Sequence, residues 1–303
     1  MDDMNMNLVE LIKDFADENK CRAYLESLRW PDGVTCPRCE SAKVYRILKR
    51  DQFVCDSCSY QFSVTVGTIF HDTHLPLWNW FLATYLLTES GKGMSANQMK
   101  RQLNVSYKTA WYLCHRIRAA MLEVAPEKLG GTVEIDETYV GGKKRRWRPR
   151  SNKQVVIGIR QRNGDLRLIR AEDAKSETVR QIINANIGGH VEVIMTDESA
   201  IYPWALDKMQ KKLHKTINHT REYAHGDVHT NTVESAFSLL KRGIVGTWHK
   251  VSAKHLPAYL DEMCFRFNNR KNPYLFRDTV MKLIASPNLE YKELTAQEAE
   301  PAA

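Results

Sequence analysis

The chain has 303 residues, of which 43% are hydrophobic and 26% charged, as in an ordinary globular protein with one or more sizeable cores. No apolar stretch approaches the roughly 20 residues that span a bilayer, and the acidic N-terminus lacks the basic and apolar regions of a signal peptide, so we expect a cytoplasmic protein with no membrane partner. The net charge of +8 favours a polyanionic partner, because lysine and arginine side chains release counterions from phosphates.

The first 72 residues divide into a helical segment and a metal-binding module. Apolar residues at helical spacing over 8–28 predict one or two short helices that end before Pro31, so residues 1–30 are expected to form an N-terminal helical segment. Residues 31–72 follow with short runs of alternating character, which are typical of hairpins, and with two CxxC pairs at their tips.

Four of the seven cysteines form the pattern C-x2-C-x15-C-x2-C. They are Cys36, Cys39, Cys55 and Cys58. Tetrahedral zinc takes four soft ligands, and each CxxC turn offers two thiolates from one tight loop. A shell of four thiolates has no open position, so the pattern predicts a zinc ribbon with one structural Zn2+. Such ribbons bind nucleic acid or protein, and the residues do not distinguish the two partners.

From residue 77 the hydrophobic period is helical. Residues 77–90, 95–103 and 106–121 predict three helices, and the short break between the last two gives the layout of a helix-turn-helix. Residues 73–126 are therefore expected to be a helical DNA-binding segment. On the last helix, the basic residues expected to face DNA are Lys108, Arg116 and Arg118. A plain three-helix bundle with a basic, solvated face is the alternative.

From residue 132 the period changes to two. Four strands are expected, at 132–140, 154–162, 166–172 and 191–197. A helix at 175–187 precedes the fourth strand, and further helices follow it, the clearest at 230–244 and 253–270. This order predicts an α/β domain with a mixed sheet over residues 131–275. Residues 276–303 remain as a C-terminal segment with an acidic tail that we expect to be disordered.

Two aspartates lie at strand positions suited to a functional site. Asp136 alternates with the apolar residues of its strand and so lies on the opposite face, whereas Glu137 projects the other way. Asp197 ends the strand 191–197, at the edge where α/β sheets place their functional groups. By themselves, both positions are equally compatible with ordinary strand-end carboxylates.

A third carboxylate, Glu234, lies on the helix at 230–244. One polar face of that helix carries Asn231, Glu234, Ser238 and Lys241, beside an apolar stripe. Carboxylate oxygens bind Mg2+, and two such ions about 3.5–4 Å apart stabilise the attacking and leaving oxygens of a phosphodiester. The residues alone do not single out these acids from the others in the chain.

Three segments together resemble a known family. VEIDETYVGG, MTDESAIY and HTNTVESAFSLLKRGIVGTWHKVSAKHLPAYLDEMCFRFNNR are similar to segments of bacterial insertion-sequence transposases of the DDE type, in the subgroup that has an N-terminal zinc ribbon. The resemblance extends from the ribbon to about residue 275. It implies a ribonuclease H-like (retroviral-integrase-like) catalytic domain with a mixed sheet and helices.

The same resemblance implies the roles of the acids. Asp136, Asp197 and Glu234 match the three metal-binding acids, with 36 residues between the last two. They would hold two catalytic Mg2+ ions, which Mn2+ can replace. Lys241 matches the basic residue one to two turns later on the helix. Related chains vary the third ligand, so Asn231, one turn before Glu234, is the alternative.

Further candidate residues flank these motifs. The run KKRRWRPR is expected to contact the DNA backbone, with a solvated loop as the alternative. Its cations are Lys143, Lys144, Arg145, Arg146, Arg148 and Arg150. His229 and His249 flank the third motif, and we expect each to make a local hydrogen bond or a phosphate contact rather than to bind the metal.

The resemblance implies a bacterial enzyme that cuts at transposon ends and joins the freed 3′-hydroxyl to target DNA, with no covalent enzyme intermediate. Its partners would be the terminal inverted repeats and target DNA, bound by a homodimer or a larger assembly. Two alternatives share its sequence features. One is a nuclease of the same fold that does not join strands, and the other is an inactive or domesticated DNA-binding protein.

Overall fold

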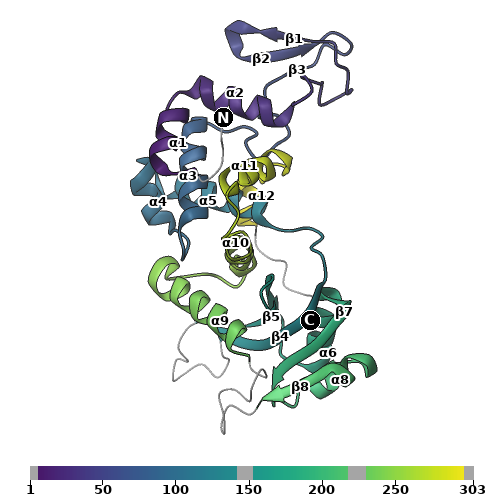
Figure 1. Cartoon of the computed structure of the whole chain (residues 1–303). Helices are drawn as coiled ribbons and strands as arrows, with labels where there is room; N and C mark the ends of the chain where they lie inside the picture. The colour runs from purple at the N-terminus through teal and green to yellow at the C-terminus, as the bar shows by residue number, and fades with distance from the viewer. Residues whose placement is uncertain (1–5, 142–152, 218–229, 297–303) are drawn as a thin grey trace. The chain divides into compact units, whose positions relative to one another are not determined.

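The computed structural model describes residues 6–141, 153–217 and 230–296 (Figure 1). The chain divides into two compact units. The helical unit comprises Met1–Met121 together with Lys271–Ala303, and the second unit comprises Leu122–Arg270. We call the second unit the catalytic unit, after the role that the family resemblance implies for it. Within the described ranges, no helix is long and apolar enough to cross a membrane.

Helices from both ends of the chain build the helical unit. They are α1 (Leu8–Phe15), α2 (Glu18–Arg29), α3 (Leu77–Glu89), α4 (Ala96–Leu103), α5 (Tyr107–Met121), α11 (Leu275–Ala285) and α12 (Tyr291–Thr295). Side-chain caps start several of them: Ser95 accepts a hydrogen bond from the third backbone N–H of α4, and Ser106 accepts one from Thr109. At the centre, the ring of Phe276 packs against those of Phe15 and Phe81, 6.0 and 5.7 Å away between centroids.

The zinc ribbon is a small three-stranded antiparallel sheet within this unit. Its strands, in the order β1-β2-β3, are β1 (Val44–Ile47), β2 (Gln52–Cys55) and β3 (Gln61–Phe62), with a short 3-10 helix, η1 (Leu48–Arg50), between the first two. Phe53 and Phe62 form its apolar centre with two of the cysteines, and Trp30 packs on them. So small an apolar core gives little stability by itself, which is why such a module needs a metal.

The catalytic unit is built on a five-stranded sheet. Its strands are β4 (Leu129–Val140), β5 (Gln154–Gln161), β6 (Leu166–Ala171), β7 (Ile187–Asp197) and β8 (His214–Ile217). Their order in the sheet is β6-β5-β4-β7-β8, with antiparallel pairing among β4, β5 and β6 and parallel pairing from β4 to β7 and from β7 to β8. This mixed sheet is that of the ribonuclease H-like fold.

Two apolar clusters lie on the two faces of the sheet. On one face, Val133 and Ile135 of β4 pack with residues of α6 (Ser176–Asn186) and α7 (Tyr202–Ala205). On the other face, Val156 of β5 packs with α9 (Asn231–Gly243) and α10 (Leu256–Asn268). The remaining elements are α8 (Lys208–Leu213) and a π-helical turn, η2 (Ile244–Trp248), which continues α9.

All the helices and strands expected from hydrophobic period are present, with ends shifted by a few residues. The structure adds β8, which lies in a region expected to be mainly helical, and it adds α11 and α12 in the C-terminal segment. The tail after Pro287 was expected to be disordered, but residues 288–296 are described and include α12, so the prediction is wrong for them; residues 297–303 lie outside the described residues.

Candidate active site

The four ribbon cysteines are arranged to hold one zinc ion. Their Sγ atoms all lie within 4.8 Å of one another, and three pairs are 3.5 to 3.7 Å apart. A zinc ion about 2.3 Å from four sulfurs requires sulfur–sulfur edges of about 3.8 Å. The ribbon cysteines therefore fit a structural Zn2+, as the sequence predicts.

Asp136 and Asp197 lie on neighbouring parallel strands of the catalytic unit. The register between β4 and β7 pairs Val133 with Ile194 and Glu134 with Met195. Continuing that register by two residues along both strands brings Asp136 beside Asp197. Both side chains are half-buried. The strand pairing thus places the first two predicted acids at one point of the sheet.

The electrostatics of Asp136 show which charges surround it. Burial, the largest cause, and the nearby carboxylates Asp197, Glu137 and Glu234 together raise the pKa of Asp136 to about 7, while the backbone N–H of Glu137 opposes the rise. That N–H donates to Oδ1 of Asp136 at 2.8 Å. A cluster of acids that raises the pKa of its own member is the environment that a divalent cation would relieve.

Glu234 approaches the same point from α9. It lies in the first turn of that helix, is half-buried, and accepts a hydrogen bond from Oγ1 of Thr230 at 3.2 Å. Among the described residues, the ribbon cysteines form the one group of three or more potential ligands that could share a single ion. Asp136, Asp197 and Glu234 are therefore not close enough to one another, as they lie in the structure, to share one ion.

Two residues near the acids were not predicted as part of the site. Glu137 projects from the face of β4 that packs against α7. There the hydroxyl of Tyr202 donates to Oε2 of Glu137 at 2.6 Å. Burial raises the pKa of Glu137, and the charge of Asp197 adds to this effect. Glu137 does project away from Asp136, as expected, but it still belongs to the same electrostatic cluster. Tyr202, which is fully buried, is the last residue of the segment MTDESAIY, so the family resemblance contained a signal for it that was not used.

Gly158 on β5 is opposite Asp136 in the sheet register, and α9 packs directly on it. A Cβ atom at this position would lie 2.7 Å from ring atoms of Phe237 and from Cγ2 of Val233. A side chain here would therefore push away the helix that carries Glu234. A glycine within a strand is a recognised sign of such close approach, so a sequence signal for this contact existed.

The remaining candidates around α9 are solvent-facing. Asn231, Lys241 and His249 are exposed, and His249 has a positive φ of 59° just after η2. Lys241 lies in the last turn of α9, as predicted. His229 lies outside the described residues, and so does the basic run that comprises Lys143, Lys144, Arg145, Arg146, Arg148 and Arg150.

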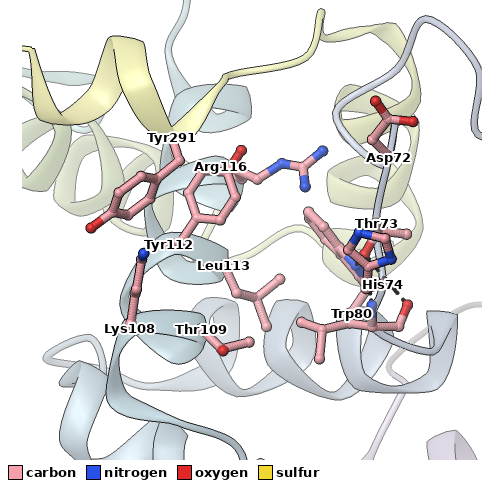
Figure 2. A pocket seen from close by; sticks show the side chains of 11 residues that line it. Asp72, Thr73, His74, Trp80, Lys108, Thr109, Tyr112, Leu113, Arg116 and Tyr291 are labelled. Atoms are coloured by element: carbon pink, nitrogen blue, oxygen red, sulfur yellow. Dashed lines mark hydrogen bonds between the residues drawn. The ribbon is translucent and has the colours of Figure 1, made fainter.

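In the predicted helix-turn-helix, the structure separates the three basic candidates. Lys108 is exposed near the start of α5, and its Nζ lies 4.4 Å from the ring centre of Tyr291 (Figure 2). Arg116 and Arg118 are only 4% and 1% exposed. The prediction that Arg116 and Arg118 face DNA is therefore wrong.

Arg116 instead lines a cavity of about 480 Å³ and holds the surrounding segments together (Figure 2). Its guanidinium donates to the backbone oxygens of Ile69 and His71 and lies 4.9 Å from the ring centre of Trp80. The side chain of Arg118 donates to the backbone oxygen of Met94 at 3.4 Å. Helical periodicity placed both arginines on the side away from the apolar stripe but could not show that other segments cover that side.

Comparisons with known proteins agree with this architecture. Residues 128–268 match the family model of the ISXO2-like transposase domain, and residues 16–61 match that of a transposase zinc-ribbon domain. A protein in transposable element ISH50 of Halobacterium salinarum is 31% identical over 273 residues, which cover 82% of this chain and 90% of that protein.

Two solved structures show a weaker likeness. The Mos1 strand transfer complex has a TM-score of 0.31 at 11% identity, and a pre-cleavage Mos1 transpososome has a TM-score of 0.26 at 12% identity. Each match covers 68% of this chain and 75% of the other. Such low TM-scores carry no conclusion, so the fold rests on the strand order of the sheet.

Proposed function

The chain belongs to the ISXO2-like transposase family, and we propose that it cuts DNA at transposon ends and joins the freed 3′-hydroxyl to target DNA. The observation that carries this proposal is the convergence of three acids from three elements. Asp136 on β4 and Asp197 on β7 are neighbours by strand register, and Glu234 on α9 is close enough to raise the pKa of Asp136.

The acid cluster suits a pair of divalent metal ions. All three side chains offer carboxylate oxygens, the ligands that Mg2+ prefers, and Mn2+ accepts the same set. When bound, such a pair would stabilise the charge that develops on the attacking and leaving oxygens of the phosphodiester. Asp136, Asp197 and Glu234 would hold it, with Asn231 as the alternative third ligand.

Two successive displacements at phosphorus account for the activity. In the first, a water oxygen attacks the phosphorus at the transposon end, the bond from phosphorus to the 3′-oxygen breaks, and that oxygen leaves as a 3′-hydroxyl. In the second, the freed hydroxyl attacks a target phosphodiester, and the target's own 3′-oxygen leaves. Neither step needs a covalent bond to the protein. The exposed Lys241 would contact a phosphate.

DNA would be bound by several parts of the chain. The net charge of +8 favours binding to the phosphate backbone. Lys108 is exposed at the start of α5, the end of a recognition helix that usually meets the base edges. The basic run from Lys143 to Arg150 would add backbone contacts. Two transposon ends must be held at once, so we expect a dimer or a larger assembly on DNA.

Substitution of single acids tests the proposed function. Asp136→Asn and Asp197→Asn should each abolish cleavage of transposon-end DNA in the presence of Mg2+, while end binding in a gel-shift assay stays within about twofold of the wild type. Glu192→Gln is the matched control, because Glu192 is an exposed acid on the same strand as Asp197. Cleavage at the wild-type rate by either aspartate variant would refute the site.

The same assay separates the alternative functions. Wild-type protein that cuts the ends but gives no joined product with target DNA would be a nuclease of the same fold. Protein that binds the ends but neither cuts nor joins them would be a DNA-binding protein derived from a transposase.

A further inference from the structure

The first turn of α9 has no side-chain cap of its own. Its N-cap residue is Thr230, which makes no capping hydrogen bond. The first N–H groups of a helix lack partners within the helix, and burying them unpaired is costly. Acceptors for Thr232 and Val233, which precede Glu234 directly, must therefore come from elsewhere in the fold.

Glu134 of β4 supplies these acceptors. Its Oε2 atom accepts hydrogen bonds from the backbone N–H of Thr232 at 3.0 Å, from that of Val233 at 3.2 Å and from the hydroxyl of Thr232 at 2.6 Å. Its Oε1 atom forms an ion pair with Nε of Arg162 at 2.8 Å. The side chain of Glu134 is fully buried.

Residues of the neighbouring strand β5 also contact the first turn of α9. The side chain of Arg160, the register partner of Glu134, donates to the backbone oxygen of Thr232 at 3.2 Å. Gly158, two residues earlier, gives α9 the room to approach. The first turn of α9 is therefore bonded to the sheet in two ways. Its backbone N–H groups donate to Glu134 of β4, and its backbone oxygen at Thr232 accepts from Arg160 of β5.

We propose that Glu134 is a positioning residue that sets the place of Glu234 relative to Asp136. Glu134 lies two residues before Asp136 on the same face of β4. Glu234 follows Val233, to whose N–H group Glu134 is bonded. One buried carboxylate thus links the strand of the first acid to the helix of the third. This proposal rests on the proposed function of the acids, which it deepens.

A carboxylate suits this role better than a neutral acceptor. Burying a charge is expensive unless it is paired and hydrogen-bonded. Here the guanidinium of Arg162 and the positive end of the helix dipole of α9 offset the cost together. The arrangement fixes α9 because the buried charge keeps Arg162 but loses the N–H groups of Thr232 and Val233 when the helix moves away. A serine or threonine cap within α9 would satisfy the same N–H groups without attaching them to β4.

The test compares Glu134→Gln with a matched control. Glutamine keeps the shape of the side chain but loses the charge and one acceptor oxygen. Glu262→Gln is the control, because Glu262 of α10 is also fully buried and forms an ion pair, with Arg266 at 3.2 Å. Two properties are measured: the Mn2+ affinity by calorimetry, and hydrogen exchange of the amides of Thr232 and Val233.

We expect Glu134→Gln to weaken Mn2+ binding at least about tenfold, the effect typical of losing a group that orients a metal ligand. Exchange at the first turn of α9 should become faster, while that of β5 stays as in the wild type. Glu262→Gln should change neither property. Unchanged Mn2+ affinity and exchange in Glu134→Gln, or equal changes in both variants, would overturn the proposal.

Glu134→Asp provides a second, more conservative variant if glutamine prevents folding. Aspartate keeps the charge but shortens the side chain by one methylene. The aspartate variant should therefore bind Mn2+ more weakly than the wild type and, where Glu134→Gln folds, more tightly than Glu134→Gln. An aspartate variant that equals the wild type in both properties counts against the proposal. Wild-type protein that binds no Mn2+ and does not cut ends would refute the proposed function, whereas the exchange result would still decide the role of Glu134.

Discussion

Among the described aspartates of the catalytic unit, burial is the largest cause of a raised pKa at two, Asp136 with a pKa of about 7 and Asp261 with a pKa of about 6. The two groups differ in their surroundings. Other acids add to the effect at Asp136, whereas burial alone accounts for Asp261 on α10. The acids around Asp136 favour a bound cation, whereas Asp261 is a carboxyl group that folding has partly withdrawn from water.

Asp261 therefore predicts a pH dependence of stability. Its pKa is higher in the folded chain than in the unfolded chain, so its favourable contribution is complete below about pH 4 and is lost as the pH rises through 6. Asp261→Asn should raise the free energy of unfolding at pH 8 by about 1–3 kcal/mol, and at pH 4.5 by about a third of that amount. Urea unfolding at the two pH values checks this. The same gain at both would contradict the assignment.

Gly158 predicts a steric effect on the active site. Gly158→Ala places a methyl group against Phe237 and Val233, and such overpacking costs about 1–3 kcal/mol. We expect a lower melting temperature and slower end cleavage, because α9 must shift with Glu234. Gly189→Ala is the control, since nothing lies within 4 Å of its added Cβ. Restored cleavage in the double variant Gly158→Ala, Phe237→Leu would support the steric cause, and full activity of the single variant would exclude it.

At the scale of elements, α5 combines two duties that its sequence does not separate. Lys108 near its start is exposed, whereas Arg116 two turns later is covered by other segments of the helical unit. Amphipathic periodicity identifies the apolar stripe of a helix but not how many neighbours surround it. The loop from Ile69 to His71 covers Arg116, and no local pattern predicts this contact.

The two residues should therefore respond differently to substitution. Lys108→Ala should weaken binding to end DNA several-fold, more at low salt than at high salt, and leave the melting temperature unchanged. Arg116→Met should lower the stability by about 1–3 kcal/mol, because it leaves backbone oxygens without their donor. Gel shifts and thermal melts of both variants decide the matter. A variant Arg116→Met as stable as the wild type would mean that the hydrogen bonds of Arg116 do not stabilise the helical unit.

The zinc ribbon predicts the effect of losing one ligand. Cys36→Ser should lower the zinc content from one equivalent to well below it, and the ribbon should unfold because its apolar core is small. Cys21→Ser is the control: Cys21 is buried in α2 and donates to the backbone oxygen of Phe15, a bond that serine can keep. Metal analysis and melting curves distinguish them. A full zinc equivalent in Cys36→Ser would show that the four-cysteine shell is wrong.

Elements were predictable from sequence where the signal was long and periodic. The helix at 77–90 and the strand at 154–162 gave clear patterns and are present as α3 and β5. The four residues of β8 are too few to show an alternation, and their pairing with β7 is a contact between distant segments. The zinc ligands were also predictable, because spacing within one short segment determines them.

On the scale of the whole molecule, the helical unit is discontinuous in sequence. The chain leaves it after Met121, forms the catalytic unit, and returns with Lys271. Phe276 of α11 completes an aromatic cluster with Phe15 and Phe81. No local pattern predicts that the two ends of the chain join, because only the packing of side chains far apart in sequence, Phe276 with Phe15 and Phe81, reveals it.

The active site divides in the same way into predictable and unpredictable parts. Motif and strand position led to Asp136 and Asp197, and helix face with family pattern led to Glu234. The contacts of Glu134 and Gly158 with α9 were not predicted, because they join residues roughly 80 to 100 positions apart. The glycine at 158 within its strand was a local sign of close approach, whereas the contacts of Glu134 follow from the fold and not from any local signal.

The most direct test of the metal-binding site is anomalous X-ray scattering at the manganese edge from crystals grown with Mn2+ and end DNA. The account predicts two peaks about 3.5–4 Å apart, with oxygens of Asp136, Asp197 and Glu234 about 2.1 Å from them. Manganese bound by Asn231 in place of Glu234 would keep the two aspartates as ligands and replace the third ligand. Manganese found elsewhere in the chain, with these three acids unligated, would contradict the account.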